Sequence, residues 1–386
     1  MNPVTHEPIT RIFLVDDQPI IGEAVRRMLA PHPRYELIAC TQGSQAVAKA
    51  LEIKPDVILQ DLVMPDADGL DVVAAYRKEA DLARTPLIVL SAREEATTKA
   101  EAFARGANDY LVKLPDPVEL VARIKYHSEA HRAQKERDAA FEALRAELNS
   151  AARYVQSLIP EPMEGEVRSQ WAFVPSASLG GDSFGYHWLD SRRLAIYLLD
   201  VCGHGVGPAL LSVSVINALT TGALGDVDPG DPGAVLVSLN KLFPMSRHNG
   251  MFFTIWYGVA DMDKRTLRYS SGGHPPALLV PPSGAARHLG AGDESGPMIG
   301  AVPDVPFGTA QTALEPGAKL YVYSDGIHEL LQPSGEMWSL EEFLQRCEAE
   351  ARQGGNVVER LLAVGRAVHG QDDFDDDVSV LEVIFP

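Results

Sequence analysis

From residue 118 to residue 159 the chain contains neither glycine nor proline. This stretch is rich in Ala, Glu, Arg and Leu, which are strong helix formers. It predicts one long helix that begins at Pro117, continues to Ile159 and is ended by Pro160 and Pro162. A chain of 386 residues is long for a single hydrophobic core, so we expect this helix to connect two domains.

The later half of this helix carries apolar residues at alternating steps of three and four. They are Phe141, Leu144, Leu148, Ala151, Val155 and Leu158. The spacing is that of the a/d seam of a coiled coil, and it predicts a homodimer. The alternative is an amphipathic helix packed on its own downstream domain, and a seam of fewer than three heptads leaves that alternative open.

Before the helix, short apolar runs alternate with helix-like segments. These runs are Ile12–Val15, Val57–Leu59, Leu87–Leu90 and Asp109–Val112. Apolar runs without polar alternation are typical of strands that are buried on both faces. The alternation of strands and helices predicts an α/β domain with a doubly wound parallel sheet over residues 1–128, followed by a helical linker over residues 129–160.

Polar residues follow these runs at the points where the strands should end. They are Asp16, Asp17, Asp61, Ser91 and Lys113. In such sheets, ligands bind beyond the carboxyl ends of the strands. Carboxylates brought together there repel one another unless a cation such as Mg²⁺ holds them, and a carboxylate beside Mg²⁺ can attack phosphorus. Any one Asp could simply cap a turn, but capping explains all five residues poorly.

These pieces resemble the receiver domain of bacterial response regulators over about residues 10–128. The matching segments are Phe13–Asp17, Leu59–Pro65, Asp68–Gly69, Val89–Ala92 and Gly106–Lys113. The resemblance implies a flavodoxin-like fold, a sensor histidine kinase as partner, and Mg²⁺ as cofactor. Lys113 is followed by Leu114-Pro115, where the family usually has Pro directly after the Lys.

The resemblance also implies individual roles for residues of this domain. Asp61 would be the phosphoacceptor, and Asp16, Asp17, Asp61 and the Val63 carbonyl would hold the metal. Ser91, Tyr110 and Lys113 would form the switch that responds to phosphorylation.

Residues 161–386 are rich in Gly and Pro and mix short strand-like runs with helical stretches, which predicts an α/β sandwich. Four motifs there carry Asp residues: Gly180–Asp182, Asp200–Gly205, Tyr323–Gly326 and Asp375–Ser379. Glycine lets the backbone approach an ion closely, and two hard cations shared by such acids can activate water and clamp a phosphoryl group. Turn formation explains a single Asp-Gly pair, and residues 372–377 could be a solvated acidic loop, but turns explain the four motifs together poorly.

The motifs resemble the metal-dependent (PPM) protein serine/threonine phosphatases of the SpoIIE type over about residues 150–386. Further matching segments are 156–160, 177–182 and Ser270–Pro276. The resemblance implies an α-β-β-α sandwich and two Mn²⁺ or Mg²⁺ ions. The sequence departs from the family at Gly185, Cys202 and Gly272, and none of these is an expected metal ligand.

The same resemblance implies how the two ions would be held. Asp200 would bridge them, the Val201 carbonyl would bind one, and Asp325 with Asp376 would complete the other. Asp182 would hold metal-bound water. His204 would protonate the leaving oxygen, or alternatively pack at the start of a helix.

Taken together, the resemblances imply a response regulator whose output removes phosphate from a protein, by family likeness an anti-sigma-factor antagonist of the STAS type. The alternative is an inactive adaptor, but all four acids expected of an active enzyme are present. A formal charge of −19 argues against nucleic-acid or anionic-membrane partners. Three cysteines without a C-x-x-C pair, and no long apolar run, are typical of an unanchored cytoplasmic protein.

Overall fold

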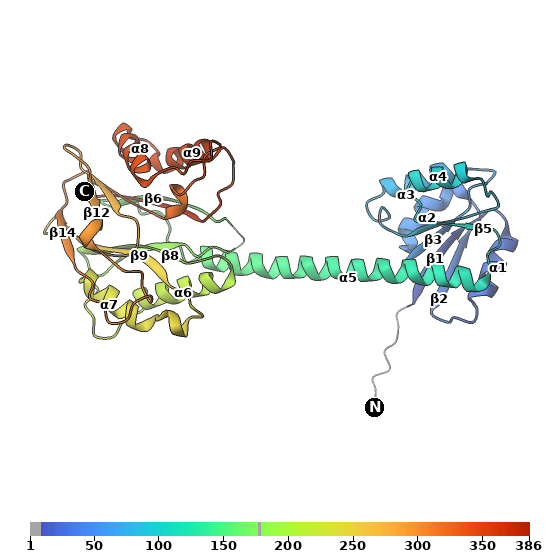
Figure 1. Ribbon diagram of the computed structural model, residues 1–386, viewed down its shortest axis with the longest axis horizontal. Helices are drawn as coiled ribbons and strands as arrows, with labels where there is room; N and C mark the ends of the chain where they lie inside the picture. Colours follow the sequence, from blue (N-terminus) through green and yellow to red (C-terminus); the bar gives the residue numbers. More distant parts are fainter. Residues whose placement is uncertain (1–8, 177–178) are drawn as a thin grey trace, which may run out of the picture. The chain divides into compact units, whose positions relative to one another are not determined.

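The computed structural model describes residues 9–176 and 179–386. It divides into two compact units, Met1–Leu144 and Arg145–Pro386 (Figure 1). The division falls within the long helix, inside the segment that the sequence assigns to the linker. Within the expected motif 177–182, Ala177 and Ser178 lie outside the described residues.

The first unit contains a five-stranded parallel sheet in the order β2-β1-β3-β4-β5, which confirms the predicted doubly wound receiver fold. Its strands are β1 (Thr10–Val15), β2 (Tyr35–Cys40), β3 (Val57–Gln60), β4 (Leu87–Ser91) and β5 (Asp109–Val112). Its helices are α1 (Pro19–Leu29), α2 (Ala46–Ile53), α3 (Gly69–Lys78), α4 (Ala96–Ala104) and the start of α5 (Pro117–Gln156).

Both faces of this sheet are covered by helices. On one face of the sheet, Phe13 and Val15 of β1 lie in the same hydrophobic cluster as Tyr76 of α3. Ile12 of β1 packs on the opposite side, in the cluster that includes Ile124 of α5. Because both faces are buried, the central strands consist of the continuous apolar runs seen in the sequence.

Helix α5 is continuous for 40 residues, as predicted, but it ends at Gln156 rather than at Ile159. The next residues form tight turns in which the N–H groups of Leu158 and Ile159 donate to carbonyls three residues back. Near its middle, Arg84 of the first unit forms a 2.8 Å ion pair with Asp138. Phe141 and Leu144 beyond it are 64% and 59% exposed, so these two seam residues are largely open to solvent in the single chain.

The second unit contains two mainly antiparallel sheets. One follows the order β13-β10-β9-β8-β7 with β14 paired to β10, and the other follows β12-β11-β15-β16-β6. The strands of the first sheet are β7 (Ser183–Trp188), β8 (Arg193–Val201), β9 (Phe253–Asp261), β10 (Thr266–Gly272), β13 (Ser295–Gly296) and β14 (Ala310–Ala313). Those of the second are β6 (Arg168–Val174), β11 (Ala277–Val280), β12 (Arg287–Leu289), β15 (Lys319–Tyr323) and β16 (Val378–Ile384).

The two sheets face each other and helices cover their outer sides (Figure 1). The inner core includes Leu198 of β8 and Leu381 of β16. The outer helices are α6 (Val206–Thr220) and α7 (Pro232–Leu242) on one side and α8 (Leu340–Gln353) and α9 (Val357–His369) on the other. This α-β-β-α arrangement is the predicted sandwich. Among the described residues, no helix combines the length and apolarity needed to cross a bilayer.

Candidate metal centres

Three carboxylates of the first unit converge beyond the ends of β1 and β3. The two strands are neighbours in register, with Val15 opposite Gln60, so the residues that follow them meet at one sheet edge. Asp16, Asp17 and Asp61 each offer an oxygen, and these oxygens all lie within 4.8 Å of one another. This is a donor set suited to a hard divalent cation such as Mg²⁺.

Lys113, which follows β5, reaches into the same cluster. Its Nζ lies 2.7 Å from Oδ2 of Asp16 and 2.8 Å from Oδ2 of Asp61, and all three side chains are largely buried. Burial alone would lower the pKa of Lys113, but hydrogen bonds to Asp16 and Asp61 outweigh burial and raise it. Burial raises the pKa of Asp16, although the bond from Lys113 opposes the rise. The Lys113–Leu114 peptide bond is cis.

The donor atoms of this cluster fit a cation. Within the described part of the chain, Oδ1 of Asp17 is buried and has no hydrogen-bond partner, as expected of an atom that serves as a metal ligand. The loop after Asp61 turns back tightly at Asp68, which accepts a 2.8 Å bond from Leu70 N at the start of α3. A Cβ on Gly69 would collide with the Asp61 carbonyl, so this turn requires glycine. Val63, whose carbonyl is an expected ligand, lies half exposed in the same loop.

Ser91 and Tyr110 are linked through the backbone of Arg93. The Oγ of Ser91 accepts a 3.3 Å bond from Arg93 N, and the hydroxyl of Tyr110 donates a 2.7 Å bond to the Arg93 carbonyl. Ser91 is fully buried at the end of β4, while Tyr110 is only partly buried. The structure thus ties both expected switch residues to one short segment after β4.

In the second unit, four acids stand at strand ends of two different sheets. Asp182 precedes β7, Asp200 lies at the end of β8, Asp325 follows β15, and Asp376 precedes β16. Their oxygens are less closely gathered than those of the first unit, since among the described residues only the first cluster brings three acids within 4.8 Å.

The negative charges of these acids nevertheless affect one another's pKa values. Burial raises the pKa of Asp200 to about 7, and the charges of Asp325 and Asp376 add to the rise. Burial likewise raises the pKa of Asp325 to about 6, with Glu329 and Asp376 contributing. Burial, followed by the charge of Asp200, raises the pKa of Asp182 well above its ordinary value. Acids that repel one another in a buried site are stabilised as anions when a cation lies between them.

The carbonyl of Val201 lies close to the backbone of Gly181, next to Asp182. A Cβ on Gly181 would collide with the Val201 carbonyl, so glycine is required where the loop before Asp182 meets the end of β8. Among the described residues, Oδ2 of Asp182 is buried without a hydrogen-bond partner. The acids and the carbonyl of Val201 therefore fit a centre for divalent cations.

His204 and Cys202 lie in the loop between β8 and α6. His204 is exposed, which does not support the alternative of a packing role at the start of the helix. The Sγ of Cys202 accepts a 3.3 Å bond from Phe252 N, so Cys202 ties this loop to the residue before β9.

Sequence reasoning missed two residues that contact the loop before Asp182. Asp377, which belongs to the motif Asp375–Ser379 but is not among the expected metal ligands, is buried and accepts a 2.7 Å bond from Gly181 N. Ser212 of α6 donates from its Oγ to the Gly181 carbonyl. The acidic string before β16 gave a signal for Asp377, whereas Ser212 lies in an apolar helix without any such signal.

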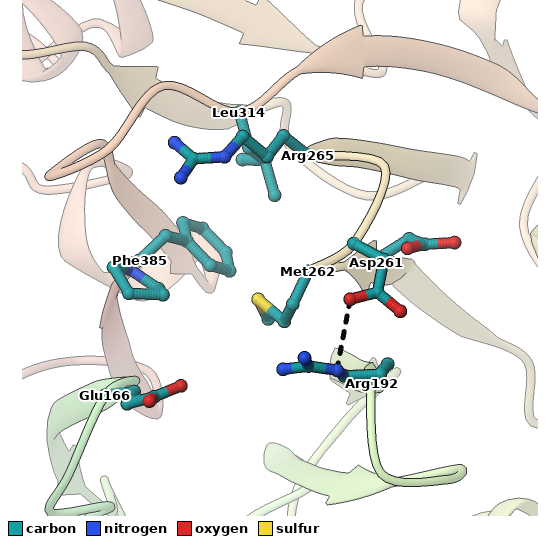
Figure 2. A pocket seen from close by; sticks show the side chains of 9 residues that line it. Glu166, Arg192, Asp261, Met262, Arg265, Leu314 and Phe385 are labelled. Carbon is teal, nitrogen blue, oxygen red and sulfur yellow. Dashed lines mark ion pairs between the residues drawn. The ribbon is translucent and has the colours of Figure 1, made fainter.

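Figure 2 shows a hollow elsewhere in the second unit, with a volume of about 460 Å³. It is lined by Glu166, Arg192, Asp261, Met262, Asp263, Arg265, Leu314, Phe385 and Pro386. Arg192 directly precedes β8, whose far end carries Asp200, and it pairs with Asp263 at 3.0 Å. The hollow is thus at the opposite end of β8 from the acids and is not part of the candidate metal centre.

Comparison with known families divides the chain in the same way. The family model described as Stage II sporulation protein E (SpoIIE) matches residues 190–386, and that of the response regulator receiver domain matches residues 12–125.

Curated relatives match one part of the chain or the other. The transcriptional regulatory protein ResD of Bacillus subtilis is 37% identical over 116 residues, which are 30% of this chain and 47% of ResD. The phosphoserine phosphatase RsbP of the same organism is 28% identical over 183 residues, which are 47% of this chain and 45% of RsbP. The chain therefore spans less than half the length of these two relatives.

Among solved structures, the SiaA-PP2C domain of Pseudomonas aeruginosa matches with a TM-score of 0.56 and 19% sequence identity. The match covers 64% of this chain and 99% of that domain. At this identity the likeness concerns the fold, and it agrees with the α-β-β-α sandwich of the second unit.

Proposed function

Because the chain belongs to the SpoIIE family and carries a receiver domain ahead of its SpoIIE domain, we propose that phosphorylation of Asp61 controls a metal-dependent protein serine/threonine phosphatase. The observation that carries the proposal is the set of four acids at strand ends of the second unit. The raised pKa values of three of them indicate a shared electrostatic site.

In the phosphatase domain, Asp200 would bridge two Mn²⁺ or Mg²⁺ ions, with Asp182, Asp325, Asp376 and the Val201 carbonyl completing the site. Bound cations supply activation of water and neutralisation of phosphate charge. The chain's part is to hold the acids in fixed positions, which it does by placing them at the ends of strands in two packed sheets. His204, exposed in the loop that follows Asp200, would give a proton to the leaving serine oxygen.

In the receiver, Mg²⁺ would be held by Asp16, Asp17, Asp61 and the Val63 carbonyl. A phosphoryl group on Asp61 would meet the ammonium of Lys113, which already lies 2.8 Å from that carboxylate. Ser91 would supply a hydroxyl to the phosphoryl oxygens. The phosphodonor would be a sensor histidine kinase, the usual partner of receiver domains.

The substrate would be a phosphorylated anti-sigma-factor antagonist of the STAS type. Support comes from the SpoIIE family model and from the likeness to RsbP, whose name describes a phosphoserine phosphatase. Dephosphorylation of such a protein would regulate a sigma factor by partner switching.

Regulation would act through α5 in a homodimer. Asp109 at the start of β5 accepts bonds of 3.0 Å from both Arg123 and His127 of α5, so the helix is tied to the strand that leads to Lys113. Phosphorylation adds charge at that edge of the sheet and would alter how the receiver holds the helix. Phe141 and Leu144, exposed in the single chain, would pair with a second copy.

The second candidate function is that of a catalytically inactive adaptor that binds a sigma-factor regulator. The presence of Asp182, Asp200, Asp325 and Asp376 favours the enzyme, since an inactive domain would be free to lose any of them.

The test is a phosphatase assay against phosphorylated STAS proteins encoded in the same genome. Hydrolysis should require Mn²⁺ or Mg²⁺ and should change when the receiver is phosphorylated beforehand with acetyl phosphate. Binding of a STAS protein without hydrolysis at any metal concentration would favour the adaptor instead.

A further inference from the structure

Asp377, in the acidic string before β16, forms a set of hydrogen bonds to a distant part of the chain. Its side chain is buried, with 3% exposure, whereas the neighbouring Asp376 is exposed. Oδ1 of Asp377 accepts bonds from the N–H and the Oγ of Ser176, at 2.9 and 3.1 Å. Oδ2 accepts a 2.7 Å bond from Gly181 N. Both oxygens of the carboxylate are therefore used as acceptors.

The bond to Gly181 fixes the residue that is joined directly to Asp182. Ser176 precedes Asp182 by six positions in the chain. A Cβ on Gly180 would collide with the Asp377 carboxylate, so Gly180 lies against the acid closely enough to require glycine.

The backbone of Asp377 contacts the other acids of the site as well. Its N–H donates a 2.8 Å bond to Oδ1 of Asp376, and its carbonyl accepts a 3.2 Å bond from the Oγ of Ser324. A Cβ on Gly326, the residue after Asp325, would collide with the same carbonyl. Asp377 thus contacts Asp376 itself and the chain neighbours of Asp182 and Asp325.

We propose that Asp377 is a positioning residue that sets the metal affinity of the phosphatase centre by fixing Asp182 through Ser176 and Gly181. The inference rests on the proposed function, because it takes Asp182 as part of the metal site. A carboxylate suits this task because it offers two charged acceptors to four donors, the fourth being Asp182 N, which lies 3.5 Å from Oδ2. Asparagine has nearly the same shape, but its NH₂ group replaces one acceptor oxygen. That group would face a donor, so the hydrogen bonds on that side would be lost.

The test measures Mn²⁺ binding to the full chain by isothermal titration calorimetry. All proteins carry Asp17→Asn, so that the receiver acids contribute less to the signal. Asp377→Asn should bind Mn²⁺ about 10- to 100-fold more weakly, as is usual when a group outside the direct metal ligands is disturbed, here Asp182 with the metal-bound water it would hold. Asp373→Asn, the same substitution at an exposed position of the same acidic string, should leave the affinity unchanged.

Hydrolysis of p-nitrophenyl phosphate separates positioning from general damage. The Mn²⁺ concentration for half-maximal rate should rise with Asp377→Asn, while kcat at saturating Mn²⁺ returns to within about threefold of the parent protein, since the ligands themselves remain. Unchanged Mn²⁺ affinity in a folded Asp377→Asn protein would overturn the proposal, as would a loss of kcat that no Mn²⁺ concentration restores.

A milder variant covers the case in which Asp377→Asn does not fold. Ser176→Ala removes one of the four bonds to the Asp377 carboxylate. It should weaken Mn²⁺ binding in the same direction as Asp377→Asn, but by less. If it leaves Mn²⁺ affinity unchanged, the proposal is wrong. A parent protein that binds Mn²⁺ but hydrolyses no phosphoprotein would contradict the proposed activity alone, whereas one that binds no Mn²⁺ would contradict the metal site and this inference together.

Discussion

The ammonium of Lys113 lies 2.8 Å from a carboxylate oxygen of Asp61, and both side chains are almost completely buried. A buried cation beside an acid can stabilise the added charge of a phosphoryl group on that acid. We therefore expect acetyl phosphate and Mg²⁺ to phosphorylate Asp61, with the mass increase found by intact-protein mass spectrometry. Asp61→Asn should block the increase, and Asp71→Asn, an exposed acid on α3, should not. Full phosphorylation of the Asp61→Asn protein would show that the acceptor is another residue.

Replacement of Asp200 should remove catalysis without unfolding the protein. Asp200 stands at the end of β8, where burial and the charges of Asp325 and Asp376 raise its pKa, so its loss removes the acid expected to bridge both cations. Asp200→Ala should abolish metal-dependent hydrolysis of a phosphoserine protein, while Asp226→Ala, an exposed acid of the same domain, retains it. A rate loss of less than about tenfold, or roughly 1.4 kcal/mol of barrier, would rule out the bridging role.

The response of stability to Mn²⁺ should depend on pH. In the folded protein without metal, the pKa of Asp200 is about 7 and that of Asp325 about 6, against an ordinary value of 3.8. The folded state therefore binds more protons than the unfolded state from about pH 3.8 up to the raised pKa values of about 6 and 7, and the contribution of these acids to stability falls as pH rises through that range.

Mn²⁺ competes with those protons, so it should raise the unfolding temperature more at about pH 8 than at about pH 5. Differential scanning fluorimetry with and without Mn²⁺ checks this, and Asp200→Asn should reduce the difference between the two pH values. Equal Mn²⁺ shifts at both pH values would mean that these acids do not bind the ion.

The seam of α5, in which Phe141 and Leu144 are exposed in the single chain, should hold two copies together. Each buried Leu contributes on the order of 2 kcal/mol, so Leu144→Glu combined with Leu148→Glu should convert a dimer to a monomer and uncouple phosphatase rate from receiver phosphorylation. Light scattering at tens of micromolar measures the mass of the parent and of the double variant.

The matched control for the seam is Glu142→Ala combined with Asn149→Ala, because these two exposed polar residues of the same helix lie at positions away from the seam. This control should keep the mass and the regulation of the parent protein. A parent protein that is monomeric, or a Leu144 and Leu148 double variant that keeps the parent's mass and regulation, would show that α5 is only a spacer.

Much of the receiver could be predicted from the sequence, because its central strands are buried on both faces and its candidate site residues directly follow them. The apolar runs ending before Asp16, Asp61 and Lys113 therefore located both the sheet and its edge. The strand β2 was not named among these runs, since it lies at the edge of the sheet and its burial is mixed along its length.

The candidate metal centre of the second unit was predictable only in part. Motifs with Asp and Gly pointed to the acids, but not to what holds them in place. The bond between Asp377 and Ser176 joins residues that are 201 positions apart, and no local pattern in a single sequence specifies such a pair. The same is true of Ser212, whose contact with Gly181 depends on how α6 packs beside β8.

The strand order of the second unit has a consequence for synthesis of the protein. β16 follows the other strands of its sheet along the chain but lies between β15 and β6 within it. While a ribosome has yet to make β16, β6 has no neighbour to pair with in that sheet, and Asp376 is missing from the metal centre. The receiver sheet is already complete once β5 has been made, and domains made first generally fold first. The receiver of a nascent chain would thus be folded before the candidate metal centre of the second unit is complete.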